Sequence, residues 1–96
     1  MDLFIFGRFH AAPGQATQLA DACAEVVGPT RAERGCIAIA SYRTIRDPQL
    51  FWIHSRWIDD ASFEAHALLP HTVHFIYRVQ ELVDEPIEVA RTHLLT

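Results

Sequence analysis

The chain has 96 residues, of which 50% are hydrophobic and 21% are charged, and this composition is typical of one compact globular domain spanning residues 1–96. Its formal net charge of −4 leaves no basic surface for a phosphate backbone, so we expect no nucleic-acid partner. No apolar run approaches the roughly 20 residues of a membrane-spanning helix, and the N-terminus lacks the basic segment of a signal peptide, so we expect a cytoplasmic protein without a membrane partner.

Missing residue types and motifs narrow the chemistry. All eight basic residues are Arg, which excludes a Lys Schiff base and a P-loop. Gly7 and Gly14 form no dinucleotide-binding fingerprint, and Cys23 and Cys36 form neither a disulfide framework nor a CxxC metal motif. Six His, six Phe, two Trp and two Tyr remain as the unusual feature. They suit an apolar pocket that contains a few titratable groups and no cofactor.

Hydrophobic periodicity predicts four strands and two helical regions. The predicted strands are Leu3–His10, Cys36–Thr44, Leu50–Trp57 and Ile87–Leu94, and the helical regions are Gln15–Val27 and Asp59–Val83. The first helix has room for one more turn through Glu33. Asp59 is a typical N-cap, and Pro70 divides the second region into a short helix and the helix His71–Val83. The order βαββαβ predicts an α+β, ferredoxin-like fold with an antiparallel sheet and helices on one face.

The predicted sheet is apolar on both faces, although a sheet covered on one side usually alternates between apolar and polar residues. Phe4 and Phe6 oppose Ile5 and Phe9 along the first strand. Helices cover one face only, and an apolar patch of this size is uncommon on a soluble monomer. We therefore expect a homodimer in which two sheets pack face to face as a dimeric α/β barrel.

The densest group of candidate site residues follows the third predicted strand. It comprises Trp57, Phe63, His66, His71 and Phe75, with Phe51, Ile53 and Ser55 on the same face of the strand as Trp57. Phe63 and His66 are three residues apart, so both can line one cavity between helix and sheet. An imidazole among aromatic rings suits a flat, apolar, aromatic ligand. Taken singly, each of these side chains is more often a core or surface residue than a catalytic one.

A metal site is the competing interpretation of the histidines. His66, His71 and His74 lie within nine positions, and His71 and His74 share a helical face. Pro70 interrupts the helical register to His66, and no acidic residue stands at a standard zinc-site spacing. The spacing therefore predicts no metal.

Several residues in order along the chain carry a resemblance to a known family. They are Pro13-Gly14, the run Glu33-Arg34-Gly35-Cys36, Asp47-Pro48, Phe51, and then Trp57, His66, Pro70, His71 and Phe75. Nearly the whole chain resembles the antibiotic biosynthesis monooxygenase family, and in particular its small quinol monooxygenases.

The resemblance implies a homodimer of ferredoxin-like subunits with a pocket between each sheet and its helices. It also implies oxidation of a small quinol or polyphenol by O2 without metal or flavin, in which the deprotonated substrate itself reduces oxygen. On this reading His66 is the proton acceptor or a hydrogen-bonding group for the substrate, Trp57 orients the substrate ring, and His71 adds a polar contact. Phe51, Ile53, Ser55, Phe63 and Phe75 line the pocket.

The resemblance has departures that leave other functions open. Ser55 stands where many family members have Glu, and Ile53 and Phe63 replace the polar pair of one polyketide-oxidising branch. Gly7 and His66 stand at positions that the haem-degrading branch uses for Asn and Trp, so the resemblance disfavours haem oxygenation. The main alternative is a non-catalytic dimeric module that binds an apolar aromatic metabolite. A weaker one is an isomerase or decarboxylase that uses His66 for proton transfer.

Overall fold

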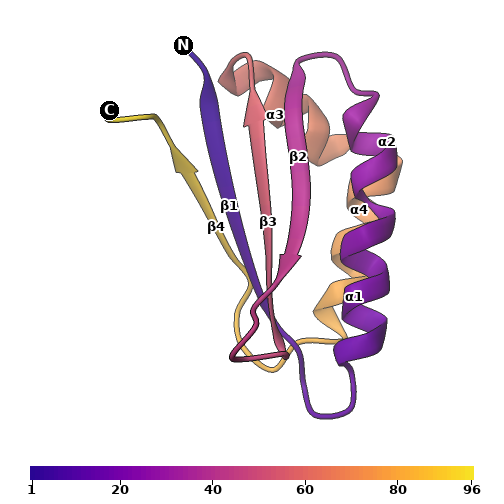
Figure 1. Ribbon diagram of the computed structural model, residues 1–96. Coiled ribbons are helices and arrows are strands. Elements are labelled where there is room, and N and C mark those ends of the chain that lie inside the picture. The colour runs from indigo at the N-terminus through magenta and orange to yellow at the C-terminus, as the bar shows by residue number, and fades with distance from the viewer.

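The computed structural model describes all residues 1–96, and it consists of one four-stranded antiparallel sheet with every helix on the same face (Figure 1). The strands lie in the order β2-β3-β1-β4, and the two chain termini lie at the same end of the sheet. The elements are β1 (Leu3–His10), α1 (Ala16–Glu25), α2 (Val27–Arg31), β2 (Cys36–Arg43), β3 (Leu50–Trp57), α3 (Asp60–Leu68), α4 (Pro70–Gln80) and β4 (Glu88–Thr92). The predicted βαββαβ order and ferredoxin-like class are confirmed. A single chain forms an open sheet, not a closed barrel.

The first predicted helix is two helices in the structure. α1 ends at Glu25 and α2 begins at Val27. Pro29 has no N–H to donate to the carbonyl of Glu25, and this interrupts the hydrogen-bond ladder. The predicted extension through Glu33 corresponds to α2 and the turn after it. At the other end of the chain, β4 ends at Thr92, two residues before the predicted limit.

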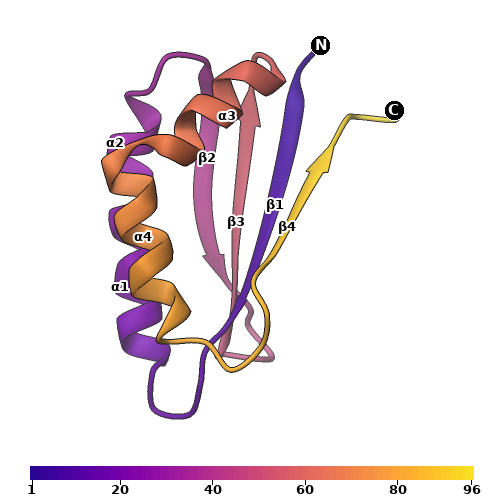
Figure 2. The same cartoon turned by 180° about the vertical axis from the view of Figure 1, so that it is seen from behind.

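Asp59 and Pro70 set the limits of α3 as predicted. Asp59 Oδ1 accepts a 2.8 Å hydrogen bond from the Ser62 N–H, and this bond is the main cause of a lowered pKa for Asp59. Leu69 is extended, with ψ of 147°, because the residue before a proline is excluded from the helical region. Pro70 then occupies the first turn of α4. The last turn of α3 and the first turn of α4 therefore meet at a sharp corner (Figure 2).

The two faces of the sheet have different surroundings. The face toward the helices contributes Ile5, Phe9, Phe51 and Trp57, which are all buried. The opposite face exposes large apolar side chains, namely Phe6 at 46%, Tyr42 at 54% and Trp52 at 36% of their surface. The predicted two-faced apolar sheet is thus present, and the pairing of two chains remains a prediction. No helix is both long enough and apolar enough to span a bilayer.

Gly35 lies in the turn between α2 and β2, and it packs against the start of α3. Its φ of +91° is unfavourable for any residue with a Cβ, and an added Cβ would lie 2.2 Å from Ser62 Oγ. The carbonyl of Gly35 accepts a 3.0 Å hydrogen bond from the Ile58 N–H just before α3. The turn can therefore approach α3 closely only because residue 35 is glycine.

We expect Gly35→Ala to lower the free energy of unfolding by more than Gly14→Ala does. Gly14 also has a positive φ, of +79°, but an added Cβ there meets nothing within 4 Å. The conformational cost of about 1–2 kcal/mol applies to both variants. Only Gly35→Ala adds a steric cost of about 1–3 kcal/mol. Urea unfolding measures the difference, and equal losses would show that the contact with Ser62 is relaxed without cost.

Candidate active site

A cavity of about 280 Å³ lies between the sheet and the corner formed by α3 and α4. Gly7 and Ile53 form part of its floor on the sheet, and Ala67 and Ile76 line it from the two helices. Ten of its fifteen lining residues are hydrophobic. A concave apolar site with a few polar groups is the usual form of a small-molecule pocket.

Most of the predicted site residues line this cavity. Ile53, Ser55, Phe63, His66 and Phe75 are all among its lining residues. Phe51 is not among them: it is 2% exposed, packs in the hydrophobic core and lies beneath the Arg43 guanidinium. Trp57 and His71 are also absent from the lining, and each contacts His66 from another side.

Trp57 lies completely buried behind the cavity wall. Its ring centroid is 4.8 Å from that of His66 and 5.7 Å from that of Phe63. Its indole N–H donates a 3.0 Å hydrogen bond to Ser55 Oγ. Because the serine oxygen already accepts this bond, its own hydroxyl hydrogen remains available to a ligand oxygen. Trp57 thus positions three groups of the cavity wall: one imidazole, one phenyl ring and one hydroxyl.

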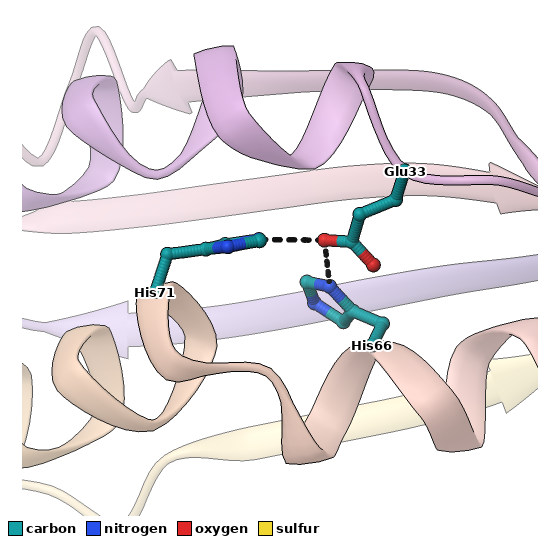
Figure 3. A group of neighbouring side chains, drawn as sticks. All are labelled: Glu33, His66 and His71. Atoms are coloured by element: carbon teal, nitrogen blue, oxygen red, sulfur yellow. Dashed lines mark hydrogen bonds and ion pairs between the residues drawn. The ribbon is translucent and has the colours of Figure 1, made fainter.

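Glu33 brings the two histidines together, as Figure 3 shows. Glu33 Oε2 lies 2.7 Å from His66 Nδ1 and 2.6 Å from His71 Nε2. The three side chains come from the turn after α2, from α3 and from the start of α4. The Glu33 side chain is only 8% exposed. A carboxylate removed from water needs strong hydrogen bonds, and the two imidazoles provide them.

The contact with Glu33 determines which nitrogen of His66 is free. A carboxylate oxygen only accepts hydrogen bonds, so Nδ1 of His66 carries the hydrogen and Nε2 carries the lone pair of the neutral ring. Thr72 Oγ1 also approaches Nδ1, at 3.2 Å. Nε2 of His66 makes no hydrogen bond within the protein. It is also not among the buried side-chain polar atoms without a partner, of which Gln49 Oε1 is the only one, so Nε2 is accessible. His66 is one of the lining residues of the cavity, and in its neutral form Nε2 is the nitrogen that can accept a proton.

His71 occupies the solvent side of this network. Its side chain is 27% exposed, compared with 12% for His66. It lines a separate hollow of about 90 Å³ between α1 and α4, together with His74. His74 makes no contact with Glu33, so only two of the three clustered histidines meet the carboxylate. The Glu33 network thus connects the interior cavity to the protein surface.

Glu33 and Thr72 are the site residues that spacing along the chain did not reveal. In the sequence, Glu33 stands out only as the end of a possible extra helical turn and as part of the Glu33-Arg34-Gly35-Cys36 run, and it lies 33 residues from His66. The position of Glu33 two residues before Gly35 could have indicated a site residue, because a glycine in a tight turn allows the neighbouring segment to approach another element closely.

The two cysteines do not supply a nucleophile. Cys23 and Cys36 are both free thiols. Burial raises the pKa of Cys23 to about 12, and burial is also the main reason that the pKa of Cys36 is raised. Both thiols therefore remain protonated at neutral pH, and the imidazole–carboxylate network is the reactive group next to the cavity.

Comparisons with known proteins agree with this fold. The chain superimposes on Rv0793 from Mycobacterium tuberculosis with a TM-score of 0.93 and 24% identity, over 100% of this chain and 97% of that chain. PA3566 from Pseudomonas aeruginosa gives a TM-score of 0.91 and 28% identity, over 99% and 95% of the two chains. A solved protein described as an antibiotic biosynthesis monooxygenase gives 0.91 and 19% identity, over 98% and 99%.

No curated protein sequence matches the chain significantly. The sequence profile of the family described as antibiotic biosynthesis monooxygenase matches residues 3–78. This match covers most of the chain, including β1, the Glu33 turn, β3, α3 and most of α4. The chain therefore belongs to the antibiotic biosynthesis monooxygenase family.

Proposed function

We propose that this protein is a cofactor-independent monooxygenase that oxidises a small aromatic quinol or polyphenol with O2. The observation that carries the proposal is the accessible Nε2 of His66, held by Glu33 at the wall of an apolar cavity. A positioned imidazole beside a dry pocket is suited to removing a phenolic proton. Family membership supports oxygenation as the reaction that follows.

The size and lining of the cavity support a small aromatic substrate. An apolar cavity of about 150 Å³ is enough to bind benzene. The cavity here, of about 280 Å³, therefore fits one substituted ring with little space left. Phe63 and Phe75 supply aromatic surface, and the Ser55 hydroxyl is the hydrogen-bond donor for a second ring oxygen.

The proposed first step is transfer of the phenolic proton to His66 Nε2. The ring becomes an imidazolium, and the Glu33 carboxylate stabilises its charge through the bond to Nδ1. The phenolate then reduces O2 and combines with it at a ring carbon. For a hydroquinone, one oxygen atom enters the ring, the other leaves as water, and the product is a hydroxyquinone. The substrate supplies every electron, so the balance needs no other reductant.

The proton taken up at His66 Nε2 returns to the oxygen atom that leaves as water, so the reaction releases no net proton. Glu33 Oε2 contacts both imidazoles, at 2.7 and 2.6 Å, and holds the His66 ring in place throughout. In this proposal Trp57 is a positioning residue, since it packs against His66 from behind the wall.

The proposed assembly is a homodimer formed through the open face of the sheet. Phe6, Tyr42 and Trp52 are partly exposed there, and with His54 they line a wide hollow. A second sheet packed on this face would bury aromatic side chains that are otherwise in water.

We expect His66→Gln to lower turnover of an accepted quinol by about 10²–10⁴-fold, the usual contribution of a positioned general base. Oxygen uptake measures turnover, and quenching of Trp57 fluorescence in a Trp52→Phe background measures binding. Binding should persist, because Gln retains much of the side-chain volume. His74→Gln is the matched control, since His74 lies outside the Glu33 network.

Unchanged oxygen uptake in His66→Gln would contradict the role of His66. Saturable quenching by quinols without any oxygen uptake in the unaltered protein would favour the binding module instead. A product without an added oxygen atom would point to an isomerase or decarboxylase.

We expect Glu33→Gln to relax the preference of His66 for the Nδ1–H form, because a neutral amide is a weaker acceptor than a carboxylate. ¹⁵N NMR of the imidazole nitrogens reports this directly, and turnover should fall in the same variant. Glu81→Gln, at an exposed position after α4, is the control. A His66 spectrum identical to that of the unaltered protein would remove Glu33 from the proposed mechanism.

We expect Trp52→Asp to convert the proposed dimer to a monomer, because a charge would then face the apolar partner sheet. Sedimentation velocity distinguishes the two states. Tyr77→Asp places the same charge on the outer surface of α4, where Tyr77 is 71% exposed, and should leave the dimer intact. A monomeric unaltered protein would refute the assembly.

A further inference from the structure

We propose that Glu33, His66 and His71 form a binding site for a divalent transition-metal ion such as Zn²⁺. Their three donor atoms, Glu33 Oε2, His66 Nδ1 and His71 Nε2, all lie within 4.8 Å of one another. Two imidazole nitrogens and one carboxylate oxygen are a common donor set for such ions in proteins. The spacing of His66, His71 and His74 predicted no metal because Pro70 interrupts the helical register and no acidic residue stands at a standard zinc-site spacing. The fold supplies the missing acidic ligand from the turn after α2 (Figure 3).

Two of the three ligands, Glu33 and His66, are largely buried before any ion arrives. The Glu33 side chain is 8% exposed and that of His66 is 12% exposed. The His66 ring packs between Trp57 and Phe63, at centroid distances of 4.8 and 5.6 Å. Ordered ligands lose little conformational freedom on binding, and this favours affinity.

The distances require only a small adjustment. Ligand atoms bound tetrahedrally at zinc distances are about 3.3 Å apart. Glu33 Oε2 now lies 2.7 and 2.6 Å from the two imidazole nitrogens, so an ion would have to widen each contact by less than an ångström. Thr72 Oγ1, at 3.2 Å from His66 Nδ1, is a nearby oxygen that can bond a metal-bound water.

The ion and the observed hydrogen bonds exclude one another. Zn²⁺ would bind His66 Nδ1 and His71 Nε2, which are the atoms whose hydrogens now reach Glu33. Each neutral ring must then carry its hydrogen on the opposite nitrogen, through exchange with water and without a net loss of protons. His66 Nε2 would become a hydrogen-bond donor and lose its lone pair. Metal binding therefore converts the candidate base into a group that cannot accept a proton.

This conversion makes the ion an inhibitor of base-dependent turnover. The inhibition rests on the proposed function, because it requires His66 to act as the base. The binding of Zn²⁺ does not rest on it, since it depends only on the three ligands.

A second histidine–carboxylate group, His10, Asp84 and Glu85, fits an ion less well. It contains a single imidazole, and its side chains are 20%, 39% and 43% exposed. Arg8 Nη1 lies 2.8 Å from Glu85 Oε1, and its positive charge opposes a cation there. His10 donates to Asp84, and this bond is the main reason for its raised pKa. A raised pKa means that a proton competes better with a metal at His10.

Calorimetric titration of the chelator-treated protein with Zn²⁺ tests the site, and Co²⁺ absorption reports its coordination. We expect one ion per chain and Co²⁺ bands typical of mixed nitrogen and oxygen ligands. His71→Ala should weaken binding by at least about 10-fold, and Glu33→Gln should do so as well. His74→Ala and His10→Gln should bind as the unaltered protein does. Circular dichroism and thermal unfolding check that each variant is folded. Because His71 is more exposed than Glu33, we expect His71→Ala to disturb folding less than Glu33→Gln does.

Unchanged Zn²⁺ affinity in folded His71→Ala, or loss of binding in His10→Gln, would overturn the site. No heat and no Co²⁺ spectrum with the unaltered protein would overturn it too. Oxygen uptake measured with and without Zn²⁺ tests the inhibition separately. Binding without any effect on quinol turnover would overturn the switch of His66 alone. If no quinol is turned over, the proposed function fails while calorimetry still decides the metal site.

Discussion

The site depends on one carboxylate that is almost entirely removed from water. Glu33 is 8% exposed, so its charge must be compensated within the protein. It receives hydrogen bonds from His66 and His71, which stand on opposite sides of Pro70. The proline forces Leu69 out of the helical conformation, and the resulting corner points both rings at the same oxygen. A local backbone constraint thereby creates a contact between segments distant in the sequence.

The same contact gives His66 its chemical character. With its hydrogen on Nδ1, the neutral ring can accept a proton only at Nε2. The His66 side chain is part of the cavity wall. An ion in place of the two hydrogens would reverse this arrangement. In the two proposals, proton abstraction and metal binding are alternative states of a single network, and competition between protons and metal ions for the same nitrogens would select between them.

The sequence was sufficient to predict the strands, the helical regions and five of the fifteen residues that line the cavity, because these depend on local patterns. Alternation in Leu50–Trp57 placed Ile53 and Ser55 on the helix-covered face, and helical spacing placed Phe63 beside His66. Whether an inward-facing residue reaches the cavity is a question of packing. Phe51 belongs to the core, and Trp57 lies behind His66. Periodicity distinguishes the two faces of a strand but not the depth within one face.

Glu33 shows why residue spacing along the sequence did not reveal the central contact. A metal or proton-transfer site is usually sought among residues with regular spacing, and the acidic partner here comes from another turn. Its approach depends on Gly35, whose missing Cβ leaves room for Ser62 at the start of α3. β3 contributes no carboxylate to the cavity lining, and its polar lining residue Ser55 accepts a hydrogen bond from Trp57. The carboxylate that contacts His66 therefore comes from the turn after α2. Glu33 links His66 to the partly exposed His71, and so to the protein surface.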